Sequence, residues 1–146
     1  AYYRLVFLEG TAAKLDRLMV ELTCFEVPIR ARRGVDLGKP PFSAHGAQLS
    51  SKTSYAASRR LGRDLRAAKV QAFLYPSARD TQAGVNVRVF DPTAFGVTRP
   101  KKLETWQCIA TKSDVEVSRR DFFRQESHRF LREEFEVRGN LPMPAT

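Results

Sequence analysis

The feature that most constrains the fold of this chain is a series of short β-forming segments, most of them joined by turns. Leu18, Val20 and Leu22 alternate with Met19, Glu21 and Thr23 and are followed by Phe25, Val27 and Ile29; this period of two is typical of a strand. Pro28 predicts that this strand lies at a sheet edge or carries a bulge. Further strands are predicted at QAFLY (71–75), VNVRVF (85–90), KLETWQCIA (102–110) and DVEVS (114–118). Because strands outnumber helices, the sequence predicts an α+β fold with a mixed or antiparallel sheet and flanking helices.

Helical periodicity is clearest in residues 54–69, SYAASRRLGRDLRAAK. Leu61 and Leu65, with Ala57 and Ala68, fall on one side of this helix. The opposite side is basic and carries Arg59, Arg60, Arg63, Arg66 and Lys69. This basic face is either an ordinary solvated surface or a contact surface for a partner. Aromatic residues that could stack on bases do not alternate with these arginines, which weakens the case for nucleic-acid binding.

Two further helices are predicted at the ends of the chain. Residues 1–10 have apolar side chains at helical spacing, with Gly10 as the C-cap. Ser118 and Asp121 predict the start of a last helix with a capping box, which Gly139 would end. One face of that helix would comprise Phe123, Ser127, Phe130, Leu131 and Glu134. Between the ends, DPTAF (91–95) predicts a helical turn, and residues 38–53 predict a connection rich in Gly, Pro and Ser.

The length and composition fit one globular domain. A chain of 146 residues with 42% hydrophobic residues can bury a packed core. No run approaches the roughly 20 apolar residues of a membrane span, and the N-terminus does not resemble a signal peptide, so a cytoplasmic location without a membrane partner is expected. Cys24 and Cys108 are predicted to be two buried thiols rather than a disulfide. With His45 and His128 as the only histidines, no metal site is predicted.

The charge predicts an anionic partner. The net charge is +9 and the isoelectric point about 10.1, which favours contact with nucleic acid, an acidic protein or a phosphorylated small molecule. Charge alone does not choose among the three. Neither histidine stands near a marked serine, and the glycines form no phosphate-binding loop after a strand.

The segment YPSARD (75–80) is the best candidate for a reactive site. Pro76 has no N–H and predicts that strand pairing stops directly after Tyr75, so the following residues leave the sheet. Ser77 could then turn its hydroxyl into a cleft, and Arg79 could grip a carboxylate or phosphate with its planar fork. The alternative is a capped turn, in which Ser77 and Asp80 bond the local backbone and Arg79 pairs with Asp80.

These residues resemble a known family. YPSARDTQAGVNVRVFDPTAF (75–95) is similar to the C-terminal signature of RES-domain proteins, which are named for Arg, Glu and Ser in their site. The resemblance continues upstream through VPIRARRGVDL (27–37), PPF (40–42) and TSYAASRRLGRDLRAAKVQAFLYPSARD (53–80), in the family's order. It covers most of residues 1–98. The individual motifs are short, but their order and spacing make the resemblance fairly specific.

The resemblance implies an ADP-ribosyltransferase-like fold and an enzyme that consumes NAD. RES proteins are toxins of two-gene modules, whose antitoxin carries a helix-turn-helix DNA-binding part. Activities known in the family are NAD breakdown, by phosphorolysis or hydrolysis, and ADP-ribosylation of a protein target. The resemblance therefore implies a site that binds NAD as its substrate and cleaves the nicotinamide–ribose bond.

The resemblance also implies residue roles. Ser77 takes the place of the family serine as the catalytic residue, and Tyr75 and Arg79 are expected to contact NAD together with it. AYYRLVFLEG (1–10) resembles a family segment with a YHR-like pattern, where Tyr3 stands in place of a histidine and is a further candidate NAD contact. The family Arg and Glu have no counterpart and are expected before Ala1. Residues 1–146 are thus expected to form a single domain, the C-terminal two-thirds of a RES domain, which is inactive alone.

Two other interpretations of the charge stay open. The chain could be a non-catalytic basic module that binds nucleic acid, for which substitution of Arg59, Arg63 and Arg66 should weaken salt-sensitive binding. Alternatively, the basic helix could receive an acidic surface of the antitoxin, which is compatible with the toxin interpretation.

Overall fold

The computed structural model describes residues 1–12, 15–82, 84–120 and 124–143, except the side chain of Arg120. The chain divides into two compact units, one formed by Ala1–Glu26 and Pro100–Met143 and the other by Val27–Arg99. Helices and two separate sheets, one antiparallel and one mixed, give an α+β fold, as predicted. The single domain predicted over residues 1–146 stays a prediction.

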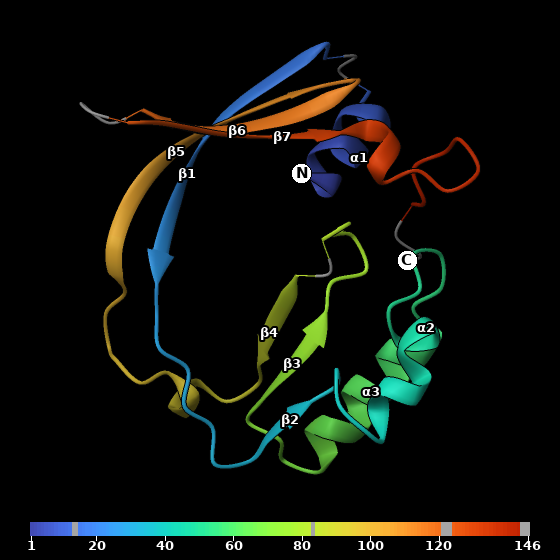
Figure 1. The fold of residues 1–146 in the computed structure, drawn as a ribbon, viewed down its shortest axis with the longest axis vertical. Helices are drawn as coiled ribbons and strands as arrows, with labels where there is room; N and C mark the ends of the chain where they lie inside the picture. The colour runs from blue at the N-terminus through green and yellow to red at the C-terminus, as the bar shows by residue number, and fades with distance from the viewer. Residues whose placement is uncertain (13–14, 83, 121–123, 144–146) are drawn as a thin grey trace. The chain divides into compact units, whose positions relative to one another are not determined.

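The first unit is built on a four-stranded antiparallel sheet (Figure 1). Its strands are β1 (Arg17–Glu26), β5 (Lys101–Thr111), β6 (Asp114–Arg120) and β7 (Gln125–Leu131), in the order β1-β5-β6-β7. β1 is an edge strand, and its register with β5 shifts between Cys24 and Glu26. The edge position and the irregularity both agree with what Pro28 predicts, although β1 ends two residues before this proline.

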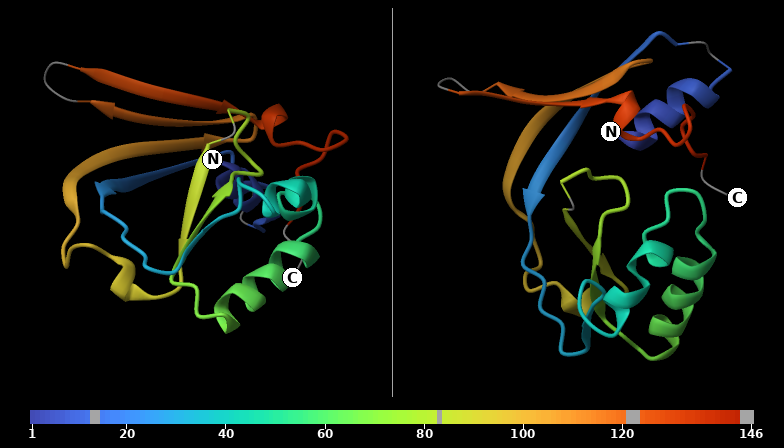
Figure 2. Two further views of the ribbon diagram at one scale, coloured as in Figure 1. Left: turned by 60° about the horizontal axis from the view of Figure 1, so that its bottom comes forward. Right: turned by 45° about the vertical axis from the view of Figure 1, so that its right-hand side comes forward.

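One face of this sheet is covered by α1 (Tyr2–Gly10) and by the 3₁₀ turn η3 (Arg132–Glu134) with the residues after it (Figure 2). The apolar core between them comprises Tyr2, Leu5, Leu8, Cys108, Ala110, Val115, Phe135 and Leu141. Helical spacing explains α1, since Tyr2, Leu5 and Leu8 are its buried residues. Gly10 is the last helical residue rather than a cap, and Thr11 beyond it is extended.

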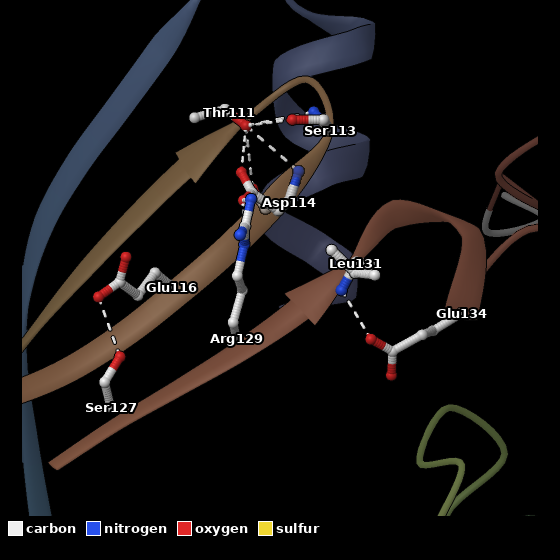
Figure 3. Close-up of polar contacts among 8 residues, drawn as sticks. All are labelled: Thr111, Ser113, Asp114, Glu116, Ser127, Arg129, Leu131 and Glu134. Atoms are coloured by element: carbon white, nitrogen blue, oxygen red, sulfur yellow. Dashed lines mark hydrogen bonds and ion pairs between the residues drawn. The ribbon is translucent and has the colours of Figure 1, made fainter.

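A buried carboxylate closes the turn between β5 and β6 (Figure 3). Asp114 accepts a hydrogen bond from the Thr111 hydroxyl and another from Nε of Arg129 on β7, at 2.6 Å. The Thr111 hydroxyl and the Arg129 guanidinium hold the pKa of Asp114 below its usual range. This carboxylate therefore links three segments of the sheet while remaining ionised.

The second unit contains a three-stranded mixed sheet in the order β2-β3-β4. β2 (Gly34–Asp36) runs parallel to the central strand β3 (Ala72–Pro76), and β4 (Val85–Val89) runs antiparallel to it. Parallel neighbours need a crossover, which here consists of η1 (Phe42–His45), α2 (Gly46–Leu49) and α3 (Ala56–Ala67). The turn predicted at 91–95 is present as η2 (Pro92–Ala94).

α3 confirms the predicted amphipathic helix and lies to one side of the three-stranded sheet (Figure 1 and Figure 2). Leu65 is buried and Leu61 half-buried, so the apolar side contributes to the core. All five basic residues of the opposite side are exposed, namely Arg59, Arg60, Arg63, Arg66 and Lys69. Within the described ranges, no helix combines the length and apolarity needed to cross a membrane.

The helix predicted to begin at Ser118 is wrong. Residues 118–120 continue β6, and Gln125–Leu131 form β7. The strands are favoured by cross-strand pairs that helical spacing does not reveal: Ser127 donates to Glu116 at 2.9 Å, as Figure 3 shows, and Arg119 bonds Glu126 at 3.5 Å. Gly139 lies in the turn between the bridged residues Val137 and Asn140, where its φ of +77° suits a glycine. Asp121 and Phe123 lie outside the described residues.

The prediction for the cysteines is correct in part. Both thiols are free, and Cys108 is buried in the core of the first unit. Cys24 is exposed rather than buried, because its side chain projects from the edge strand near the register shift.

Candidate functional site

Ser77 lies directly after β3, in the loop that leads to β4. Pro76 still pairs with Val85, and the Ser77 N–H donates to the carbonyl of Gly84 at 2.8 Å. The prediction that pairing stops at Tyr75 is therefore wrong, because a terminal proline loses only its own N–H while its neighbour still donates. The loop begins one residue later than expected and holds Ser77 at its base.

Asp80 stabilises this loop. Its Oδ1 accepts the N–H of Gln82 at 2.9 Å and its Oδ2 accepts the N–H of Gly84 at 3.0 Å. A Cβ at Gly84 would collide with the same carboxylate, so the close approach requires glycine. The capped-turn alternative is thus confirmed for both Asp80 and Ser77, since Ser77 Oγ likewise accepts a local backbone N–H, that of Arg79.

Arg79 is half-buried and contacts the crossover segment rather than Asp80. Its Nη2 donates to the carbonyl of Lys52 at 2.7 Å and to the Tyr55 hydroxyl at 2.9 Å. The backbone N–H of Arg79 also donates to Oγ of Ser77 at 3.3 Å. Arg79 therefore ties three parts together: the loop after β3, the residues before α3, and the serine hydroxyl.

The hydroxyls of Ser77 and Tyr75 keep a donor for a ligand. Ser77 Oγ accepts from Arg79, but its own proton has no acceptor in the described part of the chain. The Tyr75 hydroxyl likewise has no hydrogen-bond partner among the described residues, and its ring lies 5.6 Å from that of Phe73. Both side chains are half-buried, so each is accessible while its position is restricted.

Residues 50–59 contact the end of β3 and the loop that holds Ser77. The Ser50 hydroxyl donates to the carbonyl of Pro76 at 3.4 Å, which joins the end of α2 to the end of β3. The guanidinium of Arg59 lies over the Tyr55 ring, 5.9 Å from its centroid. Arg59 and Arg79 thus place positive charge next to Tyr55, in the segment that contacts the Ser77 loop, which suits an anionic ligand with an aromatic part.

Tyr3 belongs to the other unit. It lies on α1 with 69% of its side chain exposed, and its ring meets that of Tyr2 edge-on at 5.0 Å. The structure brings together Tyr75, Ser77 and Arg79, whereas the expected contribution of Tyr3 to NAD binding stays a prediction.

Sequence reasoning missed the role of Tyr55. This residue is part of the TSYAAS landmark, but the periodicity of the helix that follows it drew attention to Leu61 and Leu65. The available signal was its position immediately before the first helical turn, where residues near a helix N-terminus often contact neighbouring loops.

Comparison with protein families decides the assignment. The family model described as RES domain matches residues 1–110, which includes Tyr3, Tyr75, Ser77 and Arg79. The chain belongs to the RES-domain family. RES domains are associated with NAD-related toxin–antitoxin systems, in which they are typically the toxin. No match to a curated protein was found.

Proposed function

We propose that the natural protein that carries this RES domain is a toxin, which binds NAD beside Ser77 and cleaves its nicotinamide–ribose bond. The observation that carries the proposal is the position of Ser77 at the base of a pinned loop, with its hydroxyl proton available, in a chain that the RES model matches. The positive charge of Arg59 and Arg79 supports an anionic substrate, since NAD carries a diphosphate.

The reaction breaks one C–N bond and forms one C–O bond. The C–N bond between ribose and nicotinamide breaks, its electron pair neutralises the pyridinium ring, and an acceptor oxygen attacks the ribose carbon and loses a proton. The transition state resembles an oxocarbenium ion, so catalysis depends on groups that hold both halves of NAD still. Ser77 supplies a hydrogen-bond donor for this purpose, and Tyr75 supplies an aromatic surface and a second donor.

The acceptor defines the kind of NAD chemistry. Water gives ADP-ribose, inorganic phosphate gives ADP-ribose 1″-phosphate, and a protein side chain gives an ADP-ribosylated target. The three reactions share the bond-breaking step, so Ser77 is required for all of them. Separating free ADP-ribose, its 1″-phosphate and labelled protein after incubation with NAD distinguishes the three.

The partner that we propose is an antitoxin with a helix-turn-helix DNA-binding part. RES domains typically occur in a toxin–antitoxin pair. The exposed arginines of α3 offer an acidic partner a positive surface, so replacing Arg59 and Arg63 by Glu should slow complex formation, most strongly at low salt. If the antitoxin associates with this variant at the natural rate and neutralises it fully, α3 is not part of the interface.

A non-catalytic nucleic-acid-binding module is the second candidate, which the exposed basic side of α3 favours. It predicts binding to duplex or single strands that weakens steeply with salt and with loss of Arg59, Arg63 and Arg66. One variant distinguishes the two candidate functions, because Ser77→Ala should abolish NAD consumption but leave nucleic-acid binding unchanged.

A further inference from the structure

The net positive charge of the chain comes from one unit. Residues 27–99 contain 13 Lys and Arg against 4 Asp and Glu, so this segment alone accounts for the net charge of +9. The remaining residues contain 12 of each kind and are neutral as a group. An anionic ligand is therefore attracted to the second unit rather than to the chain as a whole.

The arginines of this unit are poorly compensated. The ion pairs of the first unit include Arg119, Arg129 and Arg132, each with a carboxylate partner. Among the described residues, no ion pair within 4 Å joins Arg30, Arg32 or Arg33 of the second unit to a carboxylate. Such arginines keep their full hydrogen-bonding fork for an external anion.

Two of these arginines line a surface pocket. Arg30, Arg32, Gln71 and Thr93 surround a volume of about 340 Å³ in the second unit. Gln71 precedes β3 and Ser77 follows it, so roughly 20 Å of extended strand separates the pocket from the serine. The pocket is therefore distinct from the candidate NAD site.

Hydrogen bonds fix the backbone of the pocket. Oε1 of Gln71 accepts the N–H groups of Arg32 and Arg33 at 2.9 and 3.1 Å, and its Nε2 donates to Oγ1 of Thr93 at 3.2 Å. The Arg30 N–H donates to the carbonyl of Ala94 at 2.8 Å. The arginine segment is thus held against the start of β3 and against η2, which lowers the entropy lost on binding.

The Asp91 carboxylate lies beside the pocket and is already hydrogen-bonded. Oδ1 of Asp91 accepts the N–H of Thr93 at 2.9 Å and its hydroxyl at 2.7 Å. These two bonds hold the pKa of Asp91 below its usual range, so the group stays ionised at neutral pH. Arg30 and Arg32 line the pocket and Arg33 follows them in the chain, so with Asp91 the group keeps a net positive charge that attracts a phosphate.

We propose that the pocket lined by Arg30, Arg32, Gln71 and Thr93 is a second anion site, which binds the phosphate group of a small ligand. Planar guanidinium forks match phosphate oxygens, and two arginines neutralise its two charges. The volume exceeds that of one phosphate ion, so the site has room for a phosphate ester as well as for inorganic phosphate.

The test measures binding of two probes, inorganic phosphate and AMP, by NMR titration of the natural protein at constant ionic strength. We expect saturable shifts at residues 30–33, 71 and 93, and at least tenfold weaker binding in the double variant Arg30→Gln/Arg32→Gln. Tighter binding of AMP identifies a phosphate ester as the ligand, and equal binding identifies free phosphate; both support the site.

The matched control is Arg60→Gln/Arg63→Gln, which removes the same charge from exposed positions on α3 and should retain both probes. Arg32→Lys keeps the charge but loses the fork, and should bind several-fold more weakly. Ser77→Ala should also retain probe binding, which separates this site from the proposed NAD chemistry. The proposal is wrong if neither probe binds at up to about 10 mM, if the pocket variant binds like the control, or if malonate binds as well as phosphate with the same dependence on Arg30 and Arg32.

Discussion

Nη2 of Arg79 lies 2.9 Å from the hydroxyl of Tyr55 and 2.7 Å from the carbonyl of Lys52. These bonds connect the loop after β3 to the residue at which α3 begins, across 24 positions of sequence. Since the backbone N–H of Arg79 also donates to Ser77, the position of the serine hydroxyl depends on this connection. Arg79 is therefore a positioning residue for Ser77, whether or not it also touches NAD.

Tyr55→Phe should weaken this connection without removing the aromatic ring. The lost hydrogen bond to a charged donor is expected to cost about 1–2 kcal/mol of the free energy of unfolding. The Arg79 backbone N–H, which positions the Ser77 hydroxyl, should also be held less firmly. The rate constant for NAD consumption should therefore fall more than the affinity for NAD. Denaturant unfolding and steady-state kinetics measure the two effects. The matched control, Tyr3→Phe on exposed α1, should leave the stability unchanged; equal losses in both variants would contradict the connection.

Gly84→Ala should destabilise the loop, because the new Cβ collides with the Asp80 carboxylate that accepts the Gly84 N–H. We expect a loss of about 1–3 kcal/mol in unfolding free energy, together with reduced NAD turnover. Gly62→Ala is the matched control, since Gly62 lies inside α3 with open space around it. That variant should gain about 0.5–1 kcal/mol from helix propensity. Similar effects of the two substitutions would show that the Asp80 cap does not hold the loop.

The stability of the first unit should decline in acid through Asp114. The Thr111 hydroxyl and Arg129 hold its native pKa below the unfolded value of about 4. The stabilisation is therefore complete above the unfolded pKa and is lost as the pH falls through the native one. Urea unfolding at pH 7, 5 and 3 should show a decrease below pH 5 that is smaller in Thr111→Val. Asp114→Asn should be less stable at pH 7 and vary less with pH; an unchanged pH dependence in this variant would exclude Asp114 as the cause.

Local patterns sufficed for most of the elements. Alternation gave the correct hairpin at β5 and β6, and helical periodicity gave α3 to within two residues at each end. The same logic failed after Ser118, where Ser127 and Phe130 fit a helical face but lie on β7. Pairing with β6 decided for the strand, and helical spacing along one segment does not reveal such cross-strand partners.

The candidate site likewise contains residues that the sequence could predict and residues that it could not. Ser77 and Asp80 could be placed from the sequence, because a proline-terminated strand followed by Ser and Asp predicts a capped loop. The partners of Arg79 could not, since Tyr55 and Lys52 reach it only after the crossover of η1, α2 and α3 has formed. The pocket at Gln71 was missed for the same reason, as its lining comes from three separate segments.

The most direct test of the account is NAD consumption by the natural protein and by its Ser77→Ala variant, followed by release of nicotinamide. Ser43→Ala, at an exposed serine of η1, is the control. We expect Ser77→Ala to lower kcat/KM for NAD by about 100-fold or more, with unchanged folding, because a donor aimed at the reacting substrate is lost. The control should retain full activity. Nicotinamide release by Ser77→Ala at the rate of the natural protein would contradict the central claim.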